Sequence, residues 1–153
     1  AEFAPVAKAG GLADMVAGLS RALLARGHDV RVLMPHYALA GLPVEALEVD
    51  RFLSPVRLGD GHPEVRIGTT RLGQVPAFLV AAPGLAEPGV IYGDGARELQ
   101  RFALLAHAIV PVLRSTGFAP DVIHCHDWHT ALGPLLLRAA GATPRSVLTL
   151  HNI

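Results

Sequence analysis

The sequence predicts an α/β fold, a doubly wound and mostly parallel sheet with helices on both faces. Short apolar runs typical of buried strands alternate along the chain with amphipathic helical patterns. A Gly-Gly pair stands directly before the first of these helices, as in many phosphate-binding α/β units. The 153 residues suit one domain with a substantial core.

The first helix is predicted over residues 12–26. Its apolar residues recur at three- and four-residue spacing and define one face: Leu12, Met15, Val16, Leu19 and Leu23. Gly27 suits the position that ends the helix. A compact buried strand is then predicted over residues 30–34, closed by Pro35.

The later elements follow from the same patterns. Residues 36–62 are predicted to be irregular, followed by strands over 64–71 and 75–82 joined near Gly73, and by a surface loop over 83–95. A long helix is predicted over 97–115, with a buried stripe, a kink at Pro111 and an end at Gly117. The stripe comprises Phe102, Leu105, Ala106, Ile109 and Leu113. A strand over 122–126, a helix over 130–140 and a strand over 146–150 complete the chain.

The Gly10-Gly11 pair indicates an anion site. Free backbone N–H groups and the positive end of the helix dipole favour a phosphate there, and glycine lets it approach closely. Lys8, the only lysine among thirteen Lys and Arg residues, lies at the mouth of the turn. The alternative is a plain glycine turn beside a solvated lysine. Asp14 suits the helix dipole or, equally, a hydrogen bond to a substrate hydroxyl.

A second cluster, residues 124–130, contains three histidines, Cys125 and Asp127. Such side chains can bind a metal, but alternate strand residues point to opposite faces and the segment then turns into a helix, so we expect no metal site. His124 is expected to be a core histidine with a hydrogen-bond partner. Residues 127–129 follow a strand, where ligands bind in open α/β sheets.

The composition excludes several classes of protein. Thirteen acidic residues balance thirteen basic ones, so charge gives no case for a nucleic acid or an acidic membrane as partner. No apolar run reaches the length of a membrane span, and no signal peptide opens the sequence. The single cysteine permits no internal disulfide, which fits a cytoplasmic protein.

Four blocks together resemble bacterial glycogen synthases and plant starch synthases. The first runs from Glu2 to Asp14 and is similar to the family's E-x-x-P-x-x-K-T-G-G-L-[AG]-D, with Ala9 in place of the usual Thr. Residues 121–132 resemble D-[IV]-[IV]-H-x-H-D-W-H-x-x-L, and residues 149–153 resemble T-[VI]-H-N-[IL]. Tyr92-Gly93-Asp94 and Arg101-Phe102 resemble the family's Y-x-D and R-F positions.

The resemblance implies the N-terminal, Rossmann-like domain of a two-domain GT-B glycosyltransferase, occupying residues 1–153. Such an enzyme moves glucose from ADP-glucose to the non-reducing end of an α-1,4-glucan such as glycogen, with retention of configuration. The C-terminal domain, which holds most of the nucleotide, would lie outside this chain. The implied rivals are another GT-B enzyme using a nucleotide sugar and a non-catalytic nucleotide- or glucan-binding module.

The resemblance also implies the roles of individual residues. Lys8, Gly10 and Gly11 would stabilise the departing diphosphate. Asp127 and His151 would contact the glucose and the incoming glucan hydroxyl. Asp14 and Asn152 complete the expected substrate-binding set. No metal or other cofactor is required if lysine and the helix dipole supply the counter-charge.

We also expect the chain to be truncated at both ends. It has no initiating Met, and no strand precedes the Gly-Gly loop. The absence of the second domain would remove half of the cleft, so the fragment alone is expected to be inactive. A missing central strand would expose neighbouring strand edges, so the fragment is also expected to be marginally stable or prone to aggregate.

Overall fold

A computed structural model describes residues 2–37, 49–52, 56, 59–86, 90–93 and 95–151 of the chain. The elements are named in chain order: α1 (Gly11–Ala25), β1 (Val32–Pro35), β2 (Val49–Phe52), β3 (Arg66–Leu72), β4 (Val75–Ala81), α2 (Ala96–Thr116), β5 (Val122–His126), α3 (Gly133–Ala139) and β6 (Arg145–Thr149). Among the described residues, no helix is long and apolar enough to cross a membrane.

The strands form two sheets. The larger has the order β1-β4-β3-β2, and the smaller pairs β5 with β6. Parallel pairing joins β1 to β4 and β5 to β6, whereas β3 pairs antiparallel with both β4 and β2. The antiparallel β3–β4 pair follows from connection length, because the two residues between these strands allow a hairpin and no crossover. Gly73, at φ 65°, supplies the left-handed residue of that predicted turn.

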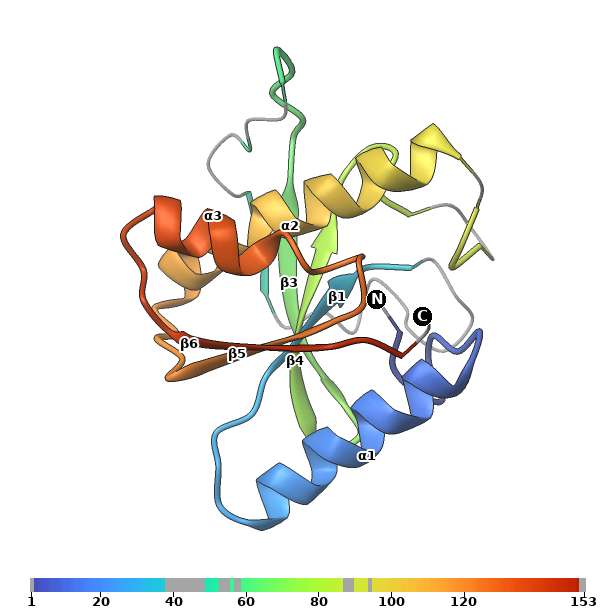
Figure 1. Cartoon of the computed structure of the whole chain (residues 1–153), viewed down its shortest axis with the longest axis vertical. Helices are drawn as coiled ribbons and strands as arrows, with labels where there is room; N and C mark the ends of the chain where they lie inside the picture. Colours follow the sequence, from blue (N-terminus) through green and yellow to red (C-terminus); the bar gives the residue numbers. More distant parts are fainter. Residues whose placement is uncertain are drawn as a thin grey trace.

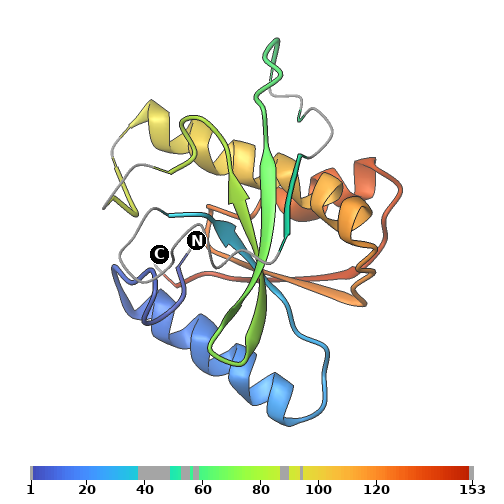
Figure 2. The same ribbon diagram turned by 180° about the vertical axis from the view of Figure 1, so that it is seen from behind.

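Helices cover both faces of the larger sheet, as predicted. Figures 1 and 2 show α1 on one side of the strands and α2 on the other, with α3 beside α2. Alternate residues of β1 and β4 enter two separate cores because successive strand side chains point to opposite faces. Val32, Met34 and Leu79 pack in the core that contains α1 residues. Phe78 and Val80 pack in the core built around α2.

Helix α1 confirms its predicted extent within one residue, and Gly27 ends it at φ 85°. The Gly27 amide donates to Leu24 O (2.9 Å) and the His28 amide to Leu23 O (3.2 Å). This pair of bonds is a Schellman motif. The predicted apolar face is only half-buried beyond Leu12, because the fully buried contact runs through the small residues Ala13, Ala17 and Ser20.

Helix α2 and its end at Gly117 confirm the prediction, apart from one stripe position. Gly117 has a φ of 66°, and Pro111 lies inside the helix. Val112 is fully buried and Leu113 is only half-buried. The buried stripe therefore ends at Val112, one residue before the predicted Leu113.

The described residues of the predicted 83–95 loop form no helix or strand, as expected, although Leu85 is fully buried and its carbonyl accepts a hydrogen bond from Arg101 Nε (2.8 Å). Two other local predictions were wrong. Residues 49–52, expected to be irregular, form β2 because β3 offers them an antiparallel partner. Helix α3 begins at Gly133, because the Thr130 hydroxyl bonds to the backbone amide and carbonyl of His126 and holds the preceding residues in turns.

His124 was also predicted incorrectly. It has the expected partner, since its Nε2 lies 2.8 Å from Thr149 Oγ1, but it is exposed and does not belong to the core. In the described residues, β5 pairs only with β6, so the face of β5 that carries His124 is left open. Sequence alone could not show which face of this strand would be covered.

Candidate functional site

The carboxyl ends of β5 and β6 bring two predicted site residues together. Parallel pairing places His126 opposite Thr149, and the Asp127 amide continues the ladder by donating to Thr149 O (2.9 Å). Asp127 then turns with a φ of 56°, the one left-handed non-glycine residue among those described. Its carboxylate accepts the His151 backbone N–H at 2.6 Å. A strained turn after β5 therefore holds the backbone at His151 in place.

These residues face the start of α1 across one pocket of about 570 Å³. The pocket unites the two regions that the sequence singled out, since Gly10 and Gly11 line it together with Asp127 and His151. Its remaining lining comprises Glu2, Ala9, Leu12, Tyr92, Glu98, Trp128 and His129. Four separate chain segments thus converge on a single cavity.

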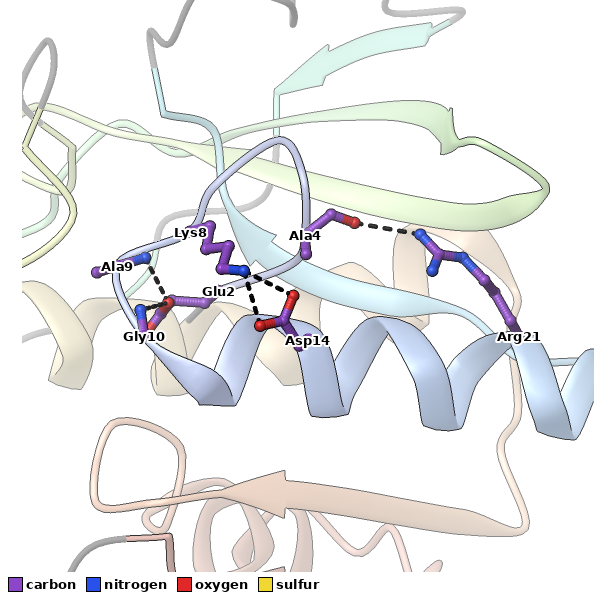
Figure 3. A network of polar contacts seen from close by, with 7 residues as sticks. All are labelled: Glu2, Ala4, Lys8, Ala9, Gly10, Asp14 and Arg21. Carbon is purple, nitrogen blue, oxygen red and sulfur yellow. Dashed lines mark hydrogen bonds and ion pairs between the residues drawn. The ribbon is translucent and has the colours of Figure 1, made fainter.

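Lys8 and Asp14 are placed at the edge of this site. The Lys8 ammonium lies 2.8 and 2.9 Å from the two Asp14 carboxylate oxygens, and both side chains are about half-exposed. Figure 3 shows this pair joining the loop to the first turn of α1. Neither residue is part of the described pocket lining. Asp14 therefore forms an ion pair with Lys8, the residue predicted to bind the phosphate. The sequence analysis did not predict this ion pair.

The Gly10 amide also has an internal partner. Glu2 Oε2 accepts hydrogen bonds from the Ala9 amide (2.7 Å) and the Gly10 amide (2.9 Å) (Figure 3). In the part of the chain that the structure describes, the amides of Gly11 and Leu12 have no such acceptor, as expected for the first turn of a helix. The N–H groups left free for a ligand are thus those of Gly11 and Leu12, one residue further along than the predicted Gly10 and Gly11.

An aromatic cluster lies beside the pocket, and three of its members, Tyr92, Trp128 and His129, belong to the pocket lining. The His129 ring lies 4.5 Å from the Phe102 ring centroid, 4.3 Å from that of Trp128 and 5.0 Å from that of Tyr92. His129 is buried, and its Nδ1 has no hydrogen-bond partner among the described residues. Burial lowers the pKa of His129 to about 4, so the ring is neutral near pH 7.

The histidines at the strand ends form a second contact group beside the pocket. His126 Nδ1 lies 3.2 Å from His151 Nε2, and the His124 and His126 rings stack at 4.2 Å. Burial, with the neighbouring His124 and His151 rings, lowers the pKa of His126 to about 4. Across the described ranges, no group of three or more His, Cys, Asp or Glu side chains is arranged to hold a metal ion.

Several pocket residues had no role in the sequence reading. Glu2 and Tyr92 were noted only as parts of motifs. Trp128 and His129 were expected to follow a strand, where ligands bind, but neither was given a role of its own. Glu98, whose carboxylate accepts the Gly93 amide (2.9 Å), carried no sequence signal at all. Of the predicted residues, Asn152 and Asp94 lie outside the described part of the chain.

Comparison with known proteins identifies the family. The starch synthase catalytic domain family model matches residues 1–153. The chain belongs to this family. It is 36% identical to glycogen synthase 2 of Geobacter sulfurreducens over 162 residues, covering 99% of this chain and 34% of that protein. It is 43% identical to the glycogen synthase of Burkholderia thailandensis over 168 residues, covering 99% and 30%.

A solved structure supports the same assignment. The catalytic domain of starch synthase IV from Arabidopsis thaliana, bound to ADP and acarbose, matches with a TM-score of 0.84 and 30% identity. The match covers 99% of this chain and 32% of that one. The predicted α/β, GT-B type of fold is thereby confirmed. The chain spans about a third of the length of the relatives that it matches.

Proposed function

We propose that this chain is the N-terminal, acceptor-side domain of a retaining GT-B enzyme that transfers glucose from ADP-glucose to the non-reducing 4-hydroxyl of an α-1,4-glucan. Family membership over the whole chain supports the reaction class. The observation that carries the proposal is the single pocket shared by the Gly10-Gly11 loop, Asp127 and His151. ADP and acarbose in the starch synthase IV structure support the choice of a nucleotide and a glucan-like sugar.

The reaction needs stabilisation of two developing charges. The departing ADP gains negative charge, which the free amides at the start of α1 and the positive end of its dipole would stabilise. The Gly11 and Leu12 amides supply these donors. Lys8 can add a cation if it exchanges Asp14 for a phosphate oxygen, because a half-exposed ion pair is weak.

Positive charge develops at the anomeric carbon on the other side of the pocket. Here the residues after β5 and β6 would face the glucose. Asp127 holds the His151 backbone amide at 2.6 Å, which fixes the direction of the peptide groups beside the sugar. In this proposal His151 contacts the sugar and Asp127 both orients that residue and contributes negative charge.

We propose that the nucleotide base binds in the part of the enzyme outside residues 1–153. We refer to a protein that contains this chain and the remaining length of its relatives as the full-length enzyme. We also propose a cytoplasmic location, which buried, unpaired Cys125 supports because thiols persist in a reducing compartment.

The test is glucose transfer from radiolabelled ADP-glucose to glycogen by the full-length enzyme, followed by digestion with an α-1,4-specific amylase. We expect label in α-1,4-linked glucose at chain ends. A substitution His151→Ala should abolish more than 99% of the rate. Incorporation from another nucleotide sugar alone would indicate a different GT-B enzyme, and binding of ADP or glycogen with no transfer would indicate a non-catalytic module.

A further inference from the structure

Glu2 is a buried carboxylate at the rim of the glycine loop. Its side chain is 4% exposed, although glutamate is seldom so fully buried. The backbone around it is fixed, since the Phe3 amide donates to Ala7 O (2.9 Å) and the Ala7 amide to Phe3 O (2.8 Å). Phe3 and Ala7 are themselves fully buried. The position of Glu2 is therefore set by the fold before any ligand arrives.

Three donors converge on this carboxylate from two parts of the chain. Oε2 accepts the Ala9 and Gly10 amides, and Oε1 accepts the Tyr92 hydroxyl at 2.5 Å. Burial by itself raises the pKa of Glu2, but these three hydrogen bonds hold it below its ordinary value. Glu2 is thus ionised at neutral pH, and each of the three donors bonds to a charged acceptor.

The Tyr92 hydroxyl connects the loop to the aromatic cluster beside the pocket. The Tyr92 ring lies 5.0 Å from the His129 ring, beside the turn that follows β5. Arg101, buried in α2, donates to Leu85 O (2.8 Å) and Ile91 O (3.2 Å) and so anchors the segment that carries Tyr92. Through Glu2 and Tyr92, the Gly10-Gly11 loop is therefore connected to α2 and to the turn after β5.

We propose that Glu2 is a positioning residue that presets the Gly10-Gly11 loop for a diphosphate. Its carboxylate binds the Ala9 and Gly10 amides, whereas the amides of Gly11 and Leu12, which line the pocket, have no acceptor among the described residues. The inference rests on the proposed function for the identity of the anion. Glu2 acts through the loop backbone, and the phosphate contacts are made by the amides that Glu2 leaves free.

Three variants of the full-length enzyme separate geometry from charge. Glu2→Ala removes the acceptor of both amides. Glu2→Gln keeps one oxygen for the two amides and places an NH₂ group beside the Tyr92 oxygen, which can accept it. Tyr92→Phe keeps the ring packing and removes only the hydroxyl. Glu64→Ala, at an exposed position ahead of β3, serves as the control.

Hydrogen exchange tests the loop independently of glucose transfer. In the unliganded wild-type enzyme the Ala9 and Gly10 amides should exchange at least tenfold more slowly than those of Gly11 and Leu12, about the protection that one charge-assisted bond gives. Glu2→Ala should abolish this difference, and Glu2→Gln should keep it. Equal exchange of all four amides in the wild type would overturn the proposal, even if the enzyme transfers glucose.

Kinetics then tests whether the preset loop serves the reaction. We expect Glu2→Ala to lower kcat about tenfold to a hundredfold, with a smaller rise in KM for ADP-glucose and no change in KM for glycogen. Glu2→Gln should recover most of that loss. Tyr92→Phe should cost less than Glu2→Ala, and the double variant should cost less than the product of the two, because both remove parts of one network.

The outcomes distinguish the two proposals. A wild-type enzyme that transfers glucose and is matched by Glu2→Ala in kcat and KM would contradict the positioning role alone. A wild type without transfer would contradict the proposed function, and the exchange pattern would then decide the loop geometry. If Glu2→Ala fails to fold, equal exchange of the Ala9, Gly10, Gly11 and Leu12 amides in the wild type would still overturn the inference.

Discussion

At the residue scale, this site depends on carboxylates that bind backbone amides. Glu2 accepts two loop amides and Asp127 accepts that of His151, so both acidic groups orient peptide groups within the pocket. The one lysine instead stays outside, paired with Asp14. This arrangement places negative charge around a pocket proposed to bind an anion. Helix-terminal amides and Lys8 must therefore supply the positive counterpart.

We predict that Lys8→Ala in the full-length enzyme lowers kcat/KM for ADP-glucose about tenfold to a hundredfold, the usual value of one charge-assisted contact. The melting temperature should hardly change, because an exposed ion pair stabilises a fold by only about 0–1 kcal/mol. Lys8→Arg should recover little, since a broad planar fork does not replace a compact ammonium.

Arg26→Ala, at the far end of α1, is the control for the Lys8 variants, and it should leave both rate and stability near wild type. An arginine variant at position 8 with a near wild-type rate would contradict the phosphate role of Lys8. Steady-state assays at several ADP-glucose concentrations measure kcat/KM, and thermal unfolding measures the melting temperature.

A second prediction concerns pH. Burial lowers the pKa of His126 and of His129 to about 4, below the ordinary histidine value of 6.5. Between these values the unfolded chain binds more protons than the folded one. The free energy of unfolding should therefore be fully retained above pH 6.5 and fall as the pH drops from 6.5 toward 4.

The direct measurement is a titration of the histidine ring protons by NMR. His126→Gln should reduce the dependence of stability on pH in urea unfolding at pH 7 and pH 5. Titration of the His126 ring near pH 6.5 would show that it is neither buried nor affected by its neighbours, contrary to this structure.

At the scale of the element, α1 illustrates how two glycines in one helix differ. Gly18 lies inside the helix, and a Cβ built there meets nothing within 4 Å. Gly27 follows the helix at φ 85°, where a Cβ also has space but the backbone conformation is unfavourable for an L residue. At Gly18 neither space nor backbone conformation disfavours a side chain, whereas at Gly27 only the backbone conformation does.

We predict that Gly18→Ala stabilises α1 by about 0.5–1 kcal/mol, because alanine loses less backbone entropy in a helix. Gly27→Ala should destabilise it by about 1–2 kcal/mol through the left-handed conformation. Amide exchange of α1 in the two variants gives both free energies. Effects of the same sign would contradict the Schellman end of the helix.

At the scale of the whole molecule, β6 and the face of β5 that carries His124 are exposed, whereas Cys125 on the other face of β5 is buried. The exposed apolar residues here are Val122, Val147, Leu148 and Leu150. This surface contrasts with β1 and β4, which helices cover on both sides. Strands with an open apolar surface and an unpaired edge tend to associate with other chains.

We therefore expect the chain of residues 1–153, produced alone, to self-associate at micromolar concentration. Leu148→Thr with Leu150→Thr should shift the sedimentation profile toward the monomer. Leu19→Thr, on the half-buried face of α1, should not. A monomeric wild-type chain at 100 μM, a concentration typical of biophysical work on aggregation-prone chains, would contradict this expectation.

We also predict that residues 1–153 alone do not transfer glucose. Our proposal places a second domain outside residues 1–153, and its closure over this pocket would exclude water from the donor. Addition of ADP-glucose and glycogen to the isolated chain should give no measurable product, whereas the full-length enzyme turns over. Activity of the isolated chain would show that this pocket suffices for donor and acceptor.

Local patterns in the sequence determined much of this structure. Helix α1, its end at Gly27, the β3–β4 hairpin and the strand β5 each follow from periodicity and turn residues within a short window. The same windows hold the motifs of the family. They also placed Gly10, Asp127 and His151 at the start of a helix or at the end of a strand. That these residues share one ligand site was implied by the resemblance to the family and did not follow from the order of the elements.

Only the tertiary structure decided which groups meet in that site. The Tyr92 hydroxyl bonds to Glu2, which is 90 positions away in the sequence. Lys8 forms an ion pair with Asp14 and does not line the pocket. The exposure of His124 depends on whether another element covers β5, and the inward anchoring of Leu85 depends on Arg101 of α2. Such contacts join segments that are distant in the chain. They depend on packing and on competition among several possible hydrogen-bond partners, and neither is encoded in a local pattern.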